Sequence, residues 1–308
     1  MERSRIGRLH VSANRSTTRT ASVVEASLSG FKFFAPHPKI ADIVDVIWDV
    51  DLPDAELARA VSLKVLPTAA PTLCVHYRAP AGSDQRINPG HCRQRMTGVQ
   101  TATITIRPTG PVGALIIHLK PEAAWALTGC GLEEFTDANI GLGDLFSPTA
   151  LSRLEDLLEE ARDGSERARL IQRFLSGRIR RNTADLVVRH AVLRLLHHPN
   201  CSVRDLASGL DISERQLSRR FHALIGTSIK RFARVVRLGK AVTARRSGAN
   251  WTEITYACGY SDQAHLIRDF KLMTGRPPDM LLKATSPARH GDLNAALAVS
   301  GFSNTFIV

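Results

Sequence analysis

The feature that most constrains the fold is a repeat in the last third of the chain. Residues 202–226 and residues 251–275 follow one pattern of apolar, basic and glycine positions. The identities that recur at the same spacing are the pairs Leu217 and Leu266, Arg219 and Arg268, Phe221 and Phe270, and Gly226 and Gly275. Chance rarely reproduces several spaced identities in the same order, so we expect two copies of one structural unit.

Each copy predicts a short helix, a tight turn and a second helix. In the first copy Ser213 can cap the second helix, and Gln216 stands three residues later, as in a capping box. Leu217, Phe221 and Leu224 then follow at the spacing of one helical stripe. This stripe predicts the buried face of the helix, and the second copy has an equivalent one.

The opposite face of the second helix is polar and partly basic in both copies. A short helix packed across a second one with a basic exposed face is typical of helix-turn-helix units that enter the major groove of DNA. Arginine suits guanine through its two-pronged guanidinium, and glutamine suits adenine. The alternative is two ordinary helical hairpins with solvated arginines, which the matched arginines disfavour. The residues predicted to contact bases are Arg215, Ser218, Arg219, Gln263, His265 and Arg268.

The segment between the copies, residues 228–246, has a helical pattern with seven Lys or Arg residues and no Asp or Glu. A rigid helix here would fix the two reading helices relative to each other. Because B-DNA repeats about every 34 Å, two fixed helices can enter successive major-groove segments on one face. Lys230, Arg231 and Arg234 are predicted to hold phosphates, which sets the register without reading sequence.

The charge distribution points to the same region. The chain has a formal net charge of +12, and residues 178–283 hold 20 Lys and Arg against 8 Asp and Glu. The remaining residues are balanced, so the whole excess lies on the repeat region, as attraction to phosphates requires. RNA is the other candidate partner, but its recognition needs aromatic rings that stack on bases. Phe221, Phe232 and Phe270 lie in apolar stripes, which favours double-stranded DNA.

Residues 185–283 resemble the DNA-binding domain of the AraC/XylS family of bacterial transcription regulators. The resemblance is carried by L-A-x-x-L-D-I-S-x-x-x-L-S-R-x-F ending at Phe221, by R-L-x-x-A at 237–241, and by I-T-Y-A-C-G-Y-S-D-Q-A-H-L-I-R-D-F-K-x-x-x-G-R-P-P ending at Pro278. It implies a regulator of transcription that binds double-stranded DNA, contacts RNA polymerase and, in the commoner family role, activates.

The residues before the repeat region predict a different architecture. Short β-prone runs at 63–66, 72–77, 101–106 and 113–119 are separated by Pro and Gly residues. They predict a small, mostly antiparallel β domain, either a barrel or a sandwich. Residues 39–48 predict a short helix with Ile40, Val44 and Ile47 facing inward.

Residues 33–129 also resemble, more loosely, the cupin-like sensor half that precedes this DNA-binding domain in one AraC subgroup. The likeness is carried by H-P-K-I-A-D-I-V-D-V-I-W at 37–48, V-L-P-T-A-A-P-T-L-C-V at 65–75 and L-I-I-H-L-K-P-E-A-A-W at 115–125. It implies a domain that binds a small effector of unknown identity, forms a homodimer, or does both. The predicted fold class is α+β: a small N-terminal β-barrel or cupin-like domain with helices, then an all-α double helix-turn-helix domain.

The expected domain organisation has five parts. These are a flexible basic tail at 1–29, a β-rich sensor domain at 30–148, a helical connector at 149–177, the DNA-binding domain at 178–285 and a C-terminal tail at 286–308. The connector carries an apolar stripe, so it either forms a dimer seam or packs on its own domain.

Composition and spacing argue against catalysis. The five cysteines are scattered without C-x-x-C, and the histidines of the β domain show no metal-ligand spacing, so we expect no metal and no cofactor. No catalytic residue is predicted, because G-x-S-x-G and a Gly-rich phosphate loop are absent. Cys74 and Cys92 can sense oxidants or electrophiles, although burial is the usual fate of cysteine. The alternative function is a metal- or thiol-dependent cupin-type enzyme with an accessory nucleic-acid-binding domain.

The same counts bear on localisation. No uninterrupted apolar run approaches the length of a membrane span, so no membrane association is predicted. Scattered cysteines in odd number argue against a disulfide framework and fit a reducing compartment. The predicted localisation is the cytoplasm.

Overall fold

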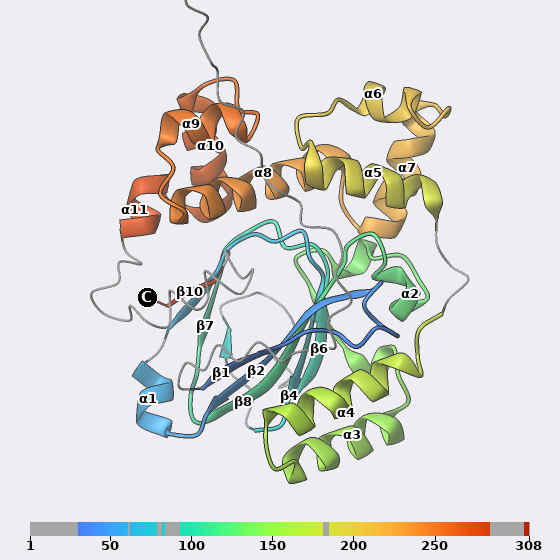
Figure 1. Cartoon of the computed structure of the whole chain (residues 1–308), viewed down its shortest axis with the longest axis vertical. Helices are drawn as coiled ribbons and strands as arrows, with labels where there is room; N and C mark the ends of the chain where they lie inside the picture. The colour runs from blue at the N-terminus through green and yellow to red at the C-terminus, as the bar shows by residue number, and fades with distance from the viewer. Residues whose placement is uncertain are drawn as a thin grey trace, which may run out of the picture.

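The computed structural model describes residues 30–60, 62–78, 82–83, 93–180, 185–283 and 305–307. The N-terminal part forms a β-sheet domain with a pair of helices packed along it, and the helices of residues 186–283 form a second domain at one end of it (Figure 1). The expected basic tail at 1–29 lies outside the described residues. Of the helices in those residues, none combines the length and apolar character that a membrane span requires.

The larger sheet is antiparallel and has the strand order β1-β2-β8-β4-β6-β9. Its strands are β1 (Phe31–Phe34), β2 (Val44–Leu52), β4 (Thr72–His76), β6 (Gln94–Thr97), β8 (Val112–Leu119) and β9 (Asn139–Gly141). The runs predicted at 72–77 and 113–119 are thus confirmed as β4 and β8, which pair with each other at the centre of the sheet.

The smaller sheet has the order β10-β3-β7-β5 and is also antiparallel. Its strands are β3 (Leu63–Val65), β5 (Gly82–Ser83), β7 (Ile104–Arg107) and β10 (Thr305–Ile307). Among the described strands the pairing gives two separate sheets and no closed barrel, so the domain is a sandwich. Strand β10 brings the end of the chain back to the N-terminal domain, within a tail for which the sequence predicted no structure (Figure 1).

The larger sheet is covered on both faces, which explains why its central strands are apolar at consecutive positions. Side chains alternate along a strand, so Leu73 and Val75 point to one face while Cys74 points to the other. The first face packs against helices α3 (Pro148–Glu160) and α4 (Gly164–Ser176), whose apolar stripes belong to the same buried cluster. Of the two alternatives for this helix pair, the structure therefore supports packing on its own domain.

The helix predicted for residues 39–48 is wrong. The chain forms turns up to Ile43, and strand β2 begins at Val44. Ile40, Val44 and Ile47 are all buried in one cluster; Ile40 lies in a turn, and a bulge between Val44 and Val46 lets both Val44 and Ile47 of the strand reach that cluster. Pairing with both β1 and β8 decides the outcome, because a strand satisfies its backbone groups on two sides there. The short helices of this domain are α1 (Ala55–Ala60), α2 (Trp125–Thr128), η1 (Glu133–Phe135) and η2 (Leu142–Asp144).

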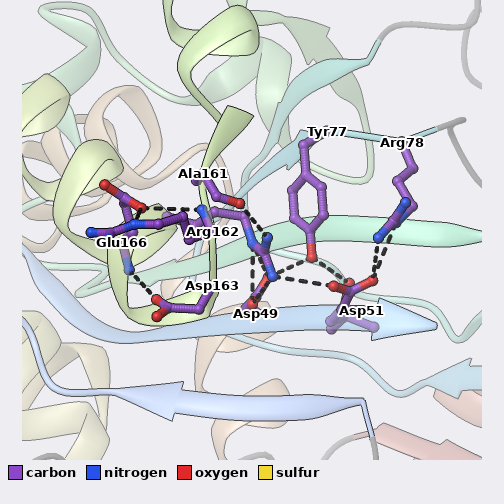
Figure 2. Close-up of polar contacts among 10 residues, drawn as sticks. Asp49, Asp51, Tyr77, Arg78, Ala161, Arg162, Asp163 and Glu166 are labelled. Carbon is purple, nitrogen blue, oxygen red and sulfur yellow. Dashed lines mark hydrogen bonds and ion pairs between the residues drawn. The ribbon is translucent and has the colours of Figure 1, made fainter. Parts of the chain in front are cut away.

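A buried charge network fixes α4 on the larger sheet. Arg167 Nη2 lies 2.9 Å from Asp49 Oδ2 and 3.2 Å from Asp51 Oδ2. The Tyr77 hydroxyl points toward the two aspartates and donates to Asp49 Oδ1 at 2.6 Å (Figure 2). Burial, together with the charge of Asp49, raises the pKa of Tyr77, so the phenol stays protonated and remains a donor. Removal of one partner would leave a buried charge, so the network is stable only as a whole.

The C-terminal domain contains the two predicted helix-turn-helix units. Its helices are α5 (Leu186–His197), α6 (Val203–Ser208), α7 (Glu214–Ile225), α8 (Ile229–Arg246), α9 (Trp251–Ala257), α10 (Gln263–Thr274) and α11 (Pro278–Lys283). The capping box of Ser213 and Gln216 is present at the start of α7. Gly226 and Gly275 end the two reading helices in the left-handed conformation, with φ of 83° and 72°.

Candidate nucleic-acid interface and ligand cavity

Helix α7 presents three of the six residues predicted to contact bases. Its apolar stripe, which includes Leu217 and Phe221, is buried in one cluster with residues of α6 and α8. Arg215, Ser218 and Arg219 are exposed on the opposite face. Within the part of the chain that the structure describes, these three side chains form no salt bridge, so they are available to an external partner.

Helix α10 presents the other three. Gln263 and Arg268 are exposed, whereas His265 is half-buried. The His265 ring lies edge-on to Tyr260 with 5.2 Å between ring centroids, and its Nδ1 lies 3.2 Å from Ser261 Oγ. The structure therefore holds His265 in one orientation, whereas Gln263 and Arg268 extend into solvent.

Asp269, which sequence reasoning missed, ties α10 to α8. Its side chain is 6% exposed, and its oxygens lie 3.3 Å from Arg234 Nε and 3.6 Å from Arg237 Nη2. Burial, followed by the charge of Asp269, raises the pKa of the neighbouring Tyr260.

Of the three residues predicted to hold phosphates, Lys230 and Arg231 are exposed. Arg234 is half-buried and forms an ion pair with Asp269. The sequence signal that could have pointed to Asp269 is an acidic residue within a mostly basic region.

The first unit has a corresponding ion pair, but here the residue on the reading helix is the cation and its partner is the anion. Arg220 occupies the position in α7 that Asp269 occupies in α10. Its Nη2 lies 2.8 Å from Oδ2 of Asp185, which also caps the N-terminus of α5. In each unit, the residue after the reading arginine therefore anchors the reading helix to a neighbouring helix.

The sheet domain holds the C-terminal ends of both reading helices. The Thr136 hydroxyl donates to the carbonyl oxygen of Gly226 at 2.8 Å. At the other unit, Thr103 donates to the carbonyl oxygen of Met273 through its backbone N–H at 3.0 Å and its hydroxyl at 3.3 Å. Apolar contacts accompany these hydrogen bonds, because Val99 is buried in the cluster of the first unit.

One loop of the sheet domain, residues 98–103, connects these contacts with each other. Gln100 and Thr68 exchange two backbone hydrogen bonds of 2.9 Å each. Thr101 donates to Asp137 through both its backbone N–H and its hydroxyl, at 2.6 Å in each case. The loop therefore connects the two contacts. It contains Thr103, which binds α10, and it is hydrogen-bonded to Asp137, the residue after Thr136, which binds α7.

A cavity of about 130 Å³ lies between the two sheets, under the same loop. One side of the cavity is apolar and includes Trp48, Val50, Leu52, Leu63, Val65 and Ile106. The side formed by β4, β6 and β9 is polar and includes His76, Arg95, Thr97 and Asn139. This division follows from the order of the strands, because β1 and β2 lie at one edge of the larger sheet and β6 and β9 at the other.

The polar side of the cavity contains titratable groups in close contact. Arg95 Nη1 lies 3.1 Å from His76 Nε2, and Cys74 Sγ lies 3.3 Å from the same nitrogen. Burial lowers the pKa of His118 to about 3, so this imidazole is neutral at physiological pH. Sequence reasoning weighed Cys74 as a sensor residue and the histidines as core or rim residues, but it gave no weight to Arg95. In the described ranges no three His, Cys, Asp or Glu side chains are grouped as metal ligands.

Comparison with protein families identifies both domains. Residues 206–284 match the family model described as a helix-turn-helix domain, which spans both units and the long helix between them. Residues 32–141 match a domain of unknown function (DUF6597). The chain therefore carries an AraC-type helix-turn-helix domain behind a domain of unknown function. The helix-turn-helix domain makes it a DNA-binding regulator of transcription.

Several solved structures show a distant likeness to this chain. ToxT from Vibrio cholerae is 10% identical, with 82% of this chain and 96% of ToxT covered and a TM-score of 0.38. A ToxT structure with a bound unsaturated fatty acid is 11% identical, covers 83% of this chain and 95% of its own, and gives a TM-score of 0.42. The AraC-like transcriptional activator CuxR is 13% identical, with 74% and 84% covered and a TM-score of 0.24. Among curated proteins, none is significantly similar to this regulator in sequence.

Proposed function

We propose that this regulator recognises a specific DNA sequence by placing α7 and α10 in two successive major-groove segments. The observation that carries the proposal is that both copies of the repeat fold as helix-turn-helix units on one helix. The buried residues of α8 are divided between the two units, with Phe232 in the cluster of the first and Leu238 in that of the second. Such a shared helix supports a fixed spacing between Arg219 and Arg268.

Two classes of contact follow from the exposure of the side chains. Arg215, Ser218 and Arg219 would read one groove segment, and Gln263, His265 and Arg268 would read the next. His265 would read from a fixed orientation, because Tyr260 and Ser261 hold its ring. Lys230 and Arg231, which are exposed at the start of α8, would bind phosphates together with Arg234.

We propose that the cavity is the site at which the regulator binds its effector. Its lining is mostly apolar with a polar side, which fits a small and partly apolar effector. Gln100 lines the cavity, and its loop reaches both contacts that hold the reading helices, Thr103 to α10 and Thr136 to α7. An effector that binds better to one arrangement of this loop would bias the position of both reading helices.

Further partners are proposed from the family alone. We infer that the regulator acts by binding and not by catalysis, that it activates by contacting RNA polymerase, and that it works in the cytoplasm. A homodimer stays a prediction. The apolar stripe of α3 and α4 is buried in the sheet domain, which leaves Leu157, 39% exposed, as its most open large apolar residue.

The proposal is tested by selecting duplexes that bind the full chain from a randomised pool. Two fixed sites in successive grooves should enrich two short sequence motifs separated by about 10 base pairs. Fluorescence anisotropy with a selected duplex and its shuffled version then measures specificity. Enrichment of a single motif, or equal affinity for both duplexes, would contradict recognition by two units.

A further inference from the structure

We propose that Cys74 is a covalent sensor residue whose thiolate captures an α,β-unsaturated carbonyl compound with an apolar tail. The proposal deepens the effector role of the cavity, on which it rests, but it does not depend on which DNA sequence is recognised. It assigns a modification site and the chemical class of the effector.

The position of Cys74 follows from the register of the larger sheet. Cys74 lies directly opposite Arg95 on β6 and Ile116 on β8. Side chains alternate along a strand, so His76, two residues later on β4, shares the face of Cys74. All four of these residues line the cavity. The thiol is free of any disulfide, and it is buried from bulk solvent, with the cavity beside it.

The neighbours of Cys74 favour its reactive form. Burial by itself raises the pKa of a thiol, but the charges of Arg95 and His76 outweigh it and lower the pKa of Cys74 to about 6. From β8, His118 faces the cavity as a neutral imidazole, because burial lowers its pKa to about 3. At neutral pH most of the Cys74 population is therefore thiolate, which is the nucleophilic form of cysteine.

His76 supplies a second and independent sign of a ligand. Its side chain is buried, at 2% exposure, and among the described residues its Nδ1 has no hydrogen-bond partner. Nε2 already faces the Cys74 sulfur at 3.3 Å, and the charged ring that stabilises the thiolate also carries a proton on Nδ1. A buried donor without a partner is costly, and a carbonyl oxygen bound in the cavity would satisfy it.

The apolar wall of the cavity favours a carbon electrophile over a small oxidant. A tail placed between Trp48 on the larger sheet and Ile106 on the smaller one would gain binding energy from burial. Hydrogen peroxide would gain nothing from that wall. A saturated carboxylate would pair with Arg95 but would not react with the Cys74 thiolate.

The reaction balances without an oxidant or a reductant. The Cys74 sulfur forms a bond to the β-carbon, the carbon–carbon π bond breaks, and its electron pair moves through the α-carbon onto the carbonyl oxygen as an enolate. Arg95 and the Nδ1–H of His76 are the donors available to that oxygen. The proton lost from the thiol is returned to the α-carbon through solvent or His76, which leaves a saturated thioether.

The test uses the full chain, trans-2-nonenal as the electrophile and saturated nonanal as its matched control. Peptide mapping by mass spectrometry follows adduct formation at Cys74 and at the exposed Cys130 in the same molecules. We expect Cys74 to react about tenfold faster than Cys130 with nonenal, because of its thiolate character, and to form no adduct with nonanal. Modification of Cys130 alone, or equal rates at both cysteines, would overturn the proposal.

A variant of Arg95 distinguishes activation of the Cys74 thiol from simple access of the electrophile to it. Arg95→Gln should slow the reaction at Cys74 about tenfold and leave Cys130 unchanged. Unchanged reactivity of Cys74 in this variant would show that Arg95 does not activate it, and would overturn the proposed site. A parallel reaction with hydrogen peroxide and dimedone tests an oxidant sensor: trapping at Cys74 there, without a nonenal adduct, also overturns it. Adducts are detected by mass alone, so a failure of selective DNA binding would count only against the proposed function.

Discussion

The hydroxyl of Thr136 donates a hydrogen bond of 2.8 Å to the carbonyl oxygen of Gly226, across 90 positions of sequence. Gly226 is the left-handed residue that ends α7, so the sheet domain contacts the reading helix at its C-terminal cap. Thr103 contacts the carbonyl of Met273 near the end of α10 in the same way. One domain thus contacts both reading helices, so a shift of the sheet domain would move both helices.

A first prediction concerns the docking of the two domains. A Cβ added at Gly131 would overlap the carbonyl oxygen of Ala223 in α7, a backbone atom that cannot move aside alone. Gly131→Ala should therefore separate the sheet domain from the first helix-turn-helix unit, because the backbone at 131 itself tolerates alanine. Hydrogen–deuterium exchange should rise in residues 132–136 and 222–227, with the urea midpoint of the helical domain unchanged.

The matched control is Gly143→Ala. An added Cβ at Gly143 meets no atom within 4 Å, so this variant should exchange like the parent chain. Equal protection of residues 222–227 in both variants would show that the docking contact is not formed in solution.

A second prediction separates reading of bases from binding of phosphates. Arg268→Ala should weaken binding to the selected duplex by about 1–3 kcal/mol and relax discrimination at one base pair, because a bidentate contact to guanine is lost. Lys230→Ala should weaken selected and shuffled duplexes alike and reduce the slope of log affinity against log salt by about 1. Anisotropy titrations over a salt series measure both effects. Equal losses on both duplexes for Arg268→Ala would exclude a base-reading role.

The helical domain was predictable because its determinants are local and occur twice. The capping box at Ser213 and Gln216 and the stripe that contains Phe221 and Phe270 specify a helix from neighbouring residues alone. The repeat then confirmed each assignment with a second copy. Docking onto the sheet domain was not predictable, because Thr136 and Gly226 carry no pattern that relates them.

The sheet domain was harder to predict, because strand pairing depends on residues far apart in sequence. The spacing of Ile40, Val44 and Ile47 fits a helix, and only the pairing of β2 with β1 and β8 shows that a strand begins at Val44. Arg95 had no local signal either. It joins Cys74 and His76 only through the register between β4 and β6. The candidate DNA-reading residues could thus be named from sequence, and the polar side of the cavity could not.

A third prediction concerns the buried anchor of α10. Asp269→Asn removes the negative charge that faces Arg234 and Arg237, and these arginines would then oppose each other without compensation. We expect the free energy of unfolding of the helical domain to fall by about 3 kcal/mol, the cost of breaking a buried ion pair. Urea denaturation followed by circular dichroism measures the change.

The control for this anchor is Glu214→Gln, at an exposed pair with Arg204 whose side chains are 53% and 83% exposed. Pairs of this kind contribute little, so the variant should lose less than about 1 kcal/mol. A loss for Asp269→Asn no larger than for Glu214→Gln would mean that Asp269 is not an anchor and that Arg234 is available to phosphates.

A fourth prediction concerns stability at mildly acidic pH. Burial lowers the pKa of His118 from 6.5 to about 3. Because the folded pKa is depressed, the stabilisation is fully present above pH 6.5 and is lost as the pH falls toward 3, where the unfolded chain binds a proton that the folded chain cannot. Between pH 6.5 and 5 this loss amounts to about 1.5 kcal/mol, before most carboxylates titrate.

Urea denaturation at pH 6.5 and at pH 5.0 measures this loss in the parent chain and in two variants. His118→Gln should remove most of the difference between the two pH values, whatever its effect on stability at either one. His190→Gln, at an exposed position on α5, should leave the difference unchanged. If His118→Gln keeps the full pH dependence, the imidazole is protonated within the folded protein, and the cavity then carries a further positive charge.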